Sequence, residues 1–258
     1  MEKITSRANP LIGHVRKLAA DRRYRRAAGE LLCEGPKLLE EALRWGAALR
    51  TVVCADPARL PSGLPDGVRL VQVPADLLQA VAPTKTPQGP LFLCAQPDSA
   101  PPERLDGRRY LVLDGLQDPG NVGTLWRTAD AFGADGLWLL PGCADPWGPK
   151  TLRATMGACF RLPVWEGGLD ALRALLDAAG LPLYATALRE DTVDVRTVDL
   201  GRSAVVIGSE GRGVSQAVLD ASARTLKIPM TPRCESLNAA SAGTVVLWQM
   251  MDRPDGEE

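Results

Sequence analysis

Short apolar runs alternate with amphipathic segments along most of the chain. Between residues 30 and 95, the apolar runs ELLCEG, LRTVVCA, RLVQV and PLFLCA alternate with KLLEEALRWG and PADLLQAVA, whose apolar residues follow a helical spacing. Apolar runs bounded by turn residues predict buried strands, whereas recurrence every three to four residues predicts helices. This part of the chain is therefore expected to form a small α/β domain, preceded by a basic helical arm.

The alternation continues on a larger scale in the second part of the chain. Strands are expected at YLVLD (110–114), LWLL (137–140), FRLPVW, PLYATAL, AVVIG (204–208) and TLKIP (225–229). Helical spacing follows in NVGTLWRTADAF, LDALRALLDAAG and SQAVLDASA, and a final helix is expected from about Ser236 to Met251. Strands and helices alternating at these lengths predict an α/β fold with a mostly parallel sheet covered on both faces.

A proline-rich polar stretch separates the two parts. Residues 96–107 read QPDSAPPERLDG and lie between two apolar runs. Such a composition is typical of a linker. We therefore predict a first domain over residues 1–98, a linker over 99–107 and a second domain over 108–258.

Composition excludes several classes of protein. The chain has 258 residues, of which 45% are hydrophobic and 24% charged, as in globular proteins with a real core. No apolar run reaches the roughly 18 residues of a membrane span, and the start MEKITSRANP has no apolar signal region, so we expect a cytoplasmic protein. Six widely spaced cysteines and one histidine argue against a disulfide framework, a metal site and a Ser/His/Asp hydrolase; Cys54 and Cys94 are expected to be small buried hydrophobes.

Charge is balanced overall but concentrated at the N-terminus. The whole chain carries a net charge of −1, whereas its first 26 residues hold eight basic and two acidic side chains. Such a cluster suits a phosphate backbone, although a solvated helix face is an equally good interpretation of this segment alone. The residues expected to contact RNA are Arg7, Arg16, Lys17, Arg22, Arg23, Arg25 and Arg26.

The loops that follow the strands are the expected location of a ligand site. In a parallel sheet, ligands bind at the carboxyl ends of the strands, which draws attention to residues 115–121, 208–215 and 230–236. In the first of these loops, Asn121 is suited to cap the following helix. Arg127 lies about 200° around that helix from Leu125, so it points away from the apolar stripe, toward either a cleft or solvent.

The other two loops contain glycine and small polar residues. The sequence GSEGRGVS (208–215) follows an apolar strand, but it is neither a dinucleotide fingerprint nor a P-loop. It therefore favours a nucleotide-like ligand without an essential pyrophosphate, and Glu210 is expected to be buried as an acceptor at the strand end. Ser236 is of a type that could cap the final helix, which is the alternative to a functional role for it. The small residues that begin this helix allow another backbone to approach within the fold or across a subunit boundary.

Taken together, NVGTLWR, GSEGRGVS and IPM with ESLNAASA resemble, in this order, the three motifs of the SpoU (TrmH-type) RNA 2′-O-ribose methyltransferases of the SPOUT superfamily. A fourth stretch, TMGACFRLPV (155–164), also matches this family's pattern, and the resemblance extends over about residues 108–252. The first domain is similar to the ribosomal-protein-like RNA-binding domain of many members. Between Met230 and Glu235 the family often carries a glycine, where this chain has TPRC.

The resemblance implies a deep trefoil knot, a homodimer of knotted domains and S-adenosylmethionine bound at the knot. The residues that would contact this donor are Gly208, Ser209, Glu210, Gly211, Ile228, Met230 and Leu237. The implied catalytic residues are Arg127, Asn121, Glu210, Ser236 and Asn238. The family's arginine is held to activate the hydroxyl; because a guanidinium hardly loses its proton, we expect Arg127 to bind phosphate and stabilise the developing alkoxide instead.

The expected reaction is methyl transfer to a ribose 2′-hydroxyl in structured RNA. Both tRNA and ribosomal RNA are substrates of similar proteins, and the accessory first domain favours ribosomal RNA. The alternative is a non-catalytic RNA-binding or ribosome-assembly protein with the same fold. A dehydrogenase is disfavoured because the first domain offers only CEGPK where a phosphate fingerprint would be needed.

Overall fold

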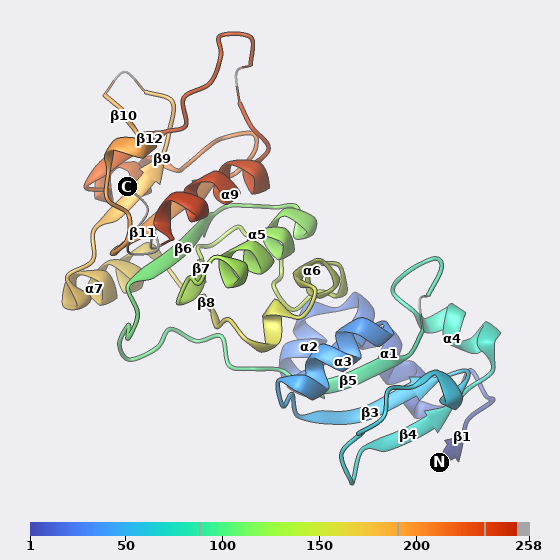
Figure 1. Cartoon of the computed structure of the whole chain (residues 1–258). Helices are drawn as coiled ribbons and strands as arrows, with labels where there is room; N and C mark the ends of the chain where they lie inside the picture. The colour runs from blue at the N-terminus through green and yellow to red at the C-terminus, as the bar shows by residue number, and fades with distance from the viewer. Residues whose placement is uncertain (88, 190, 235, 252–258) are drawn as a thin grey trace. The chain divides into compact units, whose positions relative to one another are not determined.

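The computed structural model describes residues 1–87, 89–189, 191–234 and 236–251, and its chain divides into two compact units (Figure 1). Unit 1 comprises Met1–Pro97 together with Asp145–Arg161, and unit 2 comprises Asp98–Ala144 and Leu162–Glu258. The change of unit at Pro97 falls at the proline-rich stretch. Residues 145–161, which the sequence analysis assigned to the second domain, instead pack as part of unit 1.

Unit 1 contains a five-stranded mixed sheet in the order β1-β4-β3-β5-β2. Strand β5 runs antiparallel to both of its neighbours, whereas β4 is parallel to β1 and β3. The predicted strands and helices between residues 30 and 95 are confirmed. The elements are β1 (Glu2–Lys3), α1 (Pro10–Ala20), α2 (Arg22–Ala28), β2 (Glu30–Glu34), α3 (Pro36–Arg44), β3 (Leu49–Cys54), η1 (Pro57–Arg59), β4 (Arg69–Gln72), α4 (Ala75–Val81), β5 (Leu91–Ala95), α6 (Pro149–Thr155) and η2 (Ala158–Phe160).

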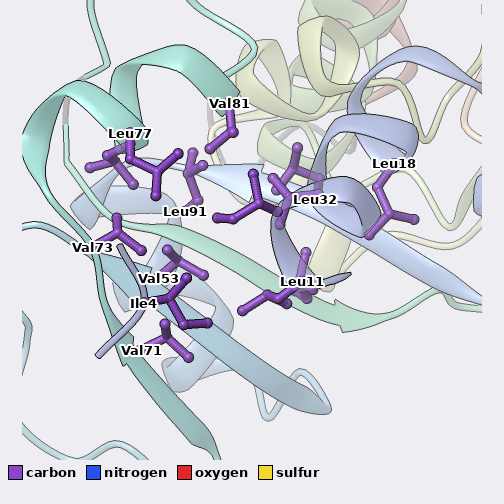
Figure 2. Packing of buried hydrophobic residues seen from close by; sticks show 14 residues of the cluster. Ile4, Leu11, Leu18, Leu32, Val53, Val71, Val73, Leu77, Val81 and Leu91 are labelled. Carbon is purple, nitrogen blue, oxygen red and sulfur yellow. The ribbon is translucent and has the colours of Figure 1, made fainter. Parts of the chain in front are cut away.

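The basic arm is part of the core of unit 1. Asp21 divides it into two helices, because its backbone is extended and its carboxylate accepts hydrogen bonds from the Arg23 and Tyr24 amides at 2.8 and 3.1 Å. The apolar face of α1 supplies Leu11 and Leu18, which pack in one cluster with residues of the sheet and of α4 (Figure 2). The cationic side chains of the arm therefore lie on a folded scaffold.

Residues 145–161 are held in unit 1 by buried polar contacts. The side chain of Arg25 is buried, and its guanidinium lies 2.5 Å from the Asp145 carboxylate and donates to the Leu18 carbonyl at 2.6 Å. At the other end of the segment, Arg161 forms an ion pair with Glu41 of α3. These pairs satisfy charges that would be costly to bury alone.

Unit 2 contains a seven-stranded sheet in the order β10-β12-β9-β11-β6-β7-β8, with every pair of neighbours parallel. The predicted parallel-sheet α/β fold is thus confirmed. Its elements are β6 (Arg109–Asp114), α5 (Pro119–Ala131), β7 (Gly136–Leu139), β8 (Val164–Glu166), α7 (Leu169–Ala179), β9 (Leu183–Thr186), β10 (Val193–Asp194), η3 (Val195–Thr197), β11 (Ser203–Gly208), α8 (Gln216–Ala221), β12 (Arg224–Lys227) and α9 (Ala239–Met250).

Helices cover both faces of this sheet. Residues of α7 and α8 pack with Val112 and Val206 on one face. On the other face α5 and α9 lie side by side (Figure 1), and a Cβ atom at Gly243 would come within 2.2 Å of the Leu125 side chain. The small residues that begin the last helix therefore serve close packing inside the fold. None of the helices formed by the described residues is long and apolar enough to cross a membrane.

Two local predictions differ from the structure. The FRLPVW strand is shorter than expected, because Ala158–Phe160 form a 3₁₀ turn and β8 begins at Val164. The final helix begins at Ala239. Near the end of this helix Trp248 is 57% exposed, whereas Met250 is buried.

We predict that Asp145→Asn lowers the free energy of unfolding by roughly 3 kcal/mol, because it leaves the buried Arg25 guanidinium without its counter-charge. Urea unfolding of the full chain measures this. Asp76→Asn is the matched control, since the Asp76–Arg7 pair is exposed and 3.4 Å apart, and it should leave stability unchanged. Equal stability of the two variants would contradict the role assigned to Asp145.

Candidate functional site

A pocket of about 300 Å³ lies at the carboxyl ends of β9, β11 and β12, where the parallel strands place their loops together. This volume is at the lower end of the range typical of small-molecule sites. The wall is mostly apolar, with backbone groups and a few polar side chains between the apolar ones. The lining residues are Thr186, Ala187, Leu188, Ile207, Gly208, Ser209, Glu210, Gly213, Leu226, Lys227, Ile228, Met230, Ser236, Leu237, Ala239 and Ala242.

The glycine loop after β11 folds back onto its own start. Ser209 and Gly213 exchange backbone hydrogen bonds of 3.0 and 2.9 Å, and Gly213 has a positive φ of 68°. A Cβ atom on Gly208 would lie 2.1 Å from the Gly213 carbonyl carbon, so only glycine fits at the end of the strand. This tight turn forms one wall of the pocket.

Asp118 caps helix α5, in place of the predicted Asn121. The Asp118 carboxylate accepts from the amides of Gly120 and Asn121 at 2.5 and 3.0 Å. The Asn121 side chain is consequently free to act elsewhere: its amide donates to the Glu210 carboxylate, and its carbonyl oxygen lies 3.4 Å from the Asn238 amide nitrogen. Residues from three sequence-distant loops thus meet at the pocket rim.

Asn238 also caps the final helix, so the alternative in which Ser236 does so is wrong. The Asn238 side-chain oxygen accepts from the amides of Ala240 and Ser241 at 2.9 and 3.3 Å. Ser236 instead lines the pocket. Glu210 also differs from expectation. It is exposed at the pocket rim, where its carboxylate accepts a hydrogen bond from the Asn121 side-chain amide.

Arg127 lies on the exposed face of α5, as its helical position predicts. Within the part of the chain that the structure describes, its guanidinium makes no hydrogen bond or ion pair, whereas the neighbouring Trp126 is fully buried and donates to the Leu162 carbonyl at 3.0 Å. The buried Trp126 side chain therefore fixes the helix in place, and the guanidinium of Arg127 remains available to bind an anion.

The structure shows one part of the pocket that the sequence analysis missed. Thr186, Ala187 and Leu188, directly after β9, line it, and Leu188 is 66% exposed. The rule that ligands bind at the carboxyl ends of parallel strands applies equally to this loop and could have found it. Among the predicted donor-contacting residues, Gly211 is outside the lining.

The basic residues of the arm fall into two groups. Arg25 is buried and paired with Asp145, so it is not available to RNA. Arg22 lies 3.7 Å from the same carboxylate. The remaining predicted contacts are exposed: Arg7, Arg16, Lys17, Arg23 and Arg26.

Burial keeps the thiols of Cys143 and Cys159 protonated. Cys234, by contrast, is exposed, and its Sγ lies 3.1 Å from the carbonyl oxygen of the lining residue Ser236. Cys143 donates to the Leu113 carbonyl at the end of β6, and burial raises the pKa of its thiol to about 11. Burial likewise raises the pKa of Cys159 to about 12. Cys54 and Cys94 are buried, as predicted. Among the described residues, no group of three or more His, Cys, Asp or Glu side chains could hold a metal ion.

The fold and the pocket define an α/β protein with a small-molecule site at the carboxyl edge of a parallel sheet, where polar side chains from distant parts of the chain meet. Residues 108–248 match the SpoU rRNA methylase family, and residues 9–91 match an MRM3-like substrate binding domain. The chain belongs to the SpoU rRNA methylase family, and the predicted family is confirmed.

Relatives span nearly the whole chain. A 23S rRNA (guanosine(2553)-2′-O)-methyltransferase of Bacillus subtilis is 34% identical over 97% of this chain and 99% of its own length. An AdoMet-bound rRNA methyltransferase of Sinorhizobium meliloti aligns with a TM-score of 0.86 and 30% identity over 96% of this chain and 97% of its own. The SpoU methyltransferase AviRb of Streptomyces viridochromogenes, in complex with AdoMet, aligns with a TM-score of 0.82 and 27% identity over 94% and 97% of the two chains. The predicted class of enzyme is thus confirmed.

We predict that Gly208→Ala abolishes ligand binding in this pocket, because the added methyl group would displace the Gly213 backbone and open the turn. Calorimetric titration with S-adenosylmethionine measures the loss. Gly211→Ala is the matched control in the same loop, since a Cβ there meets no atom within 4 Å, and it should bind normally. Normal binding by the Gly208 variant would show that the turn does not shape the site.

Proposed function

We propose that this protein transfers a methyl group from S-adenosylmethionine to the 2′-hydroxyl of a ribose in ribosomal RNA. The observation that carries the proposal is the meeting of Asn121, Glu210 and Asn238, from three distant loops, beside a pocket of nucleotide size. Two relatives that cover nearly all of the chain are named rRNA methyltransferases, which supports ribosomal RNA over tRNA. The site of action would be the cytoplasm.

The residues present suit the methyl donor. Ile207, Leu226 and Ile228 give the pocket an apolar wall for a purine ring, while backbone groups of the glycine loop remain close enough to bond a ribose. Six of the predicted donor-contacting residues line this pocket: Gly208, Ser209, Glu210, Ile228, Met230 and Leu237. When bound, S-adenosylmethionine supplies a methyl group activated by its positively charged sulfur.

The protein's own contribution is to position the ribose and stabilise charge. Arg127 binds the phosphate beside the target nucleotide and stabilises the negative charge that develops on the 2′-oxygen. Asn121 and Ser236 orient the ribose. Glu210 and Asn238 hold the Asn121 amide in place through the observed contacts. As the methyl–oxygen bond forms, the methyl–sulfur bond breaks to leave S-adenosylhomocysteine, and the 2′-hydroxyl proton passes to water. No group of the protein then has to be a strong base, which suits a site without a histidine.

The finer architecture is also proposed. The family motifs support a trefoil knot in unit 2, in which the segment between β12 and α9 threads through the fold, and a homodimer of knotted domains. Trp248 of α9 supports the dimer: it is 57% exposed and lies edge-on to Phe132 of α5, with ring centroids 5.7 Å apart. An exposed tryptophan beside a half-buried phenylalanine of the neighbouring helix is typical of an interface. RNA would be held by the exposed cations of the arm.

Arg127→Ala is expected to reduce methyl transfer to ribosomal RNA by at least a hundredfold, because the transition state loses its cationic contact, while donor affinity stays unchanged. Transfer of a radioactive methyl group to ribosomal RNA from cells lacking the gene measures the first quantity, and calorimetry the second. Arg202→Ala is the control: Arg202 is exposed and precedes β11 at the opposite edge of the sheet. Near-normal turnover of the Arg127 variant would overturn its assignment.

Trp248→Glu should convert the protein into monomers, because a carboxylate cannot be buried in an apolar contact without a partner. Analytical ultracentrifugation measures the mass in solution. The control is Gln249→Glu, which adds the same charge at the adjacent, half-buried position. A monomeric wild-type protein, or a dimeric Trp248 variant, would refute the proposed interface.

A further inference from the structure

An exposed tryptophan lies on unit 1, which does not contain the pocket-lining residues. Trp45 ends helix α3 and is 49% exposed. Its backbone amide donates to the Glu41 carbonyl at 3.0 Å, and Gly46 then turns the chain with a φ of 68°. The backbone that carries the indole is therefore fixed. Trp45 is not part of the hydrophobic core of this unit.

Two arginines flank this ring. The guanidinium of Arg161 lies 5.4 Å from the ring centroid, and that of Arg44 lies 5.9 Å from it. Arg161 is held in place by its ion pair with Glu41, so its charge is largely neutralised. Arg44 is exposed and forms no ion pair with the described residues, so its charge remains available.

This combination has a specific recognition chemistry. Single exposed apolar side chains are common and do not by themselves indicate a binding site. A rigid aromatic ring combined with arginine is different, because unpaired nucleotides bind proteins by stacking their bases on aromatic or guanidinium planes, while phosphates contact cations. An apolar protein partner would gain nothing from the charge of Arg44, and a cationic ligand would be repelled by it.

We propose that Trp45, with Arg44 and Arg161, is a stacking platform for an unpaired nucleotide of the substrate RNA. This inference rests on the proposed function and adds a second RNA contact to that of the basic arm. Arg161 keeps the indole oriented, the exposed part of the ring receives the base, and Arg44 contacts a phosphate of the same strand. The platform would favour RNA that has an unpaired nucleotide over a fully paired stem.

The test compares three variants of the full-length protein. Trp45→Leu keeps an apolar side chain but removes the aromatic face, Trp45→Phe keeps a smaller aromatic face, and Arg44→Gln keeps the indole and removes the free charge. Fluorescence anisotropy measures binding of a labelled RNA hairpin with an unpaired uridine loop, and of a blunt duplex with the same stem. Far-UV circular dichroism and urea unfolding check the fold of each variant.

Trp45→Leu should weaken hairpin binding about tenfold, given the usual strength of base stacking, and Trp45→Phe should retain most of the affinity. Arg44→Gln should lower the slope of log affinity against log salt by about one. Duplex binding should be the same in wild type and both Trp45 variants. Hairpin binding by Trp45→Leu at the wild-type level, or equal losses in the Leu and Phe variants, would overturn the proposal, as would an equal loss on the duplex.

The outcomes also separate this inference from the proposed function. If the wild-type protein transfers no methyl group to ribosomal RNA, the proposed function fails, while the hairpin comparison still tests stacking on Trp45. If the wild type methylates ribosomal RNA and Trp45→Leu binds the hairpin normally, only the platform fails. If circular dichroism shows that Trp45→Leu is misfolded, an unchanged salt slope in Arg44→Gln would still refute the proposal.

Discussion

The parallel alignment of seven strands is the constraint on which unit 2 depends. Because neighbouring strands run in the same direction, the chain must cross over after each one, and every loop at the carboxyl edge starts from a fixed point. Residues far apart in sequence, such as those after β9, β11 and β12, are brought to one pocket by this geometry. At that edge Gly208 allows the next loop to close against the strand end.

A second consequence of this geometry is that some polar residues at this edge cap helices, whereas their neighbours face the site. Asp118 satisfies the free amides at the start of α5, which leaves the Asn121 side chain available to the site. Asn238 does both tasks, with its oxygen bonding backbone amides and its nitrogen directed toward Asn121. Capping fixes where each helix begins. The position of the helix in turn fixes the side chains that would face the substrate.

The sequence pattern was sufficient for most elements, because buried strands and amphipathic helices follow directly from the spacing of apolar residues. It also selected the loops that carry the site, because strand direction determines which ends meet. It failed where several residues could do the same local task. Asp118, Asn121, Ser236 and Asn238 are all good caps by type, and only the backbone conformation decides between them.

Tertiary packing decided other features that no local pattern reveals. Arg25 looked like its exposed neighbours in a basic run, but Asp145, 120 residues later, makes it a buried structural cation. The apolar wall after β9 and the exposure of Trp45 and Trp248 likewise depend on what the remaining chain covers. The sequence therefore shows which charged and apolar side chains are present. Whether they are exposed to a ligand depends on the whole fold.

The return of residues 145–161 to unit 1 means that the boundary in sequence differs from the boundary in space. A fragment beginning at residue 108 would carry this segment with Leu152, Ala158 and Cys159 stripped of their apolar surroundings, while a fragment ending at residue 98 would lose one wall of its interior. Recombination at the linker would therefore separate residues 145–161 from the rest of unit 1, and neither fragment would have a complete core. Unit 2 could be inherited with a different unit 1 only if residues 145–161 were replaced at the same time.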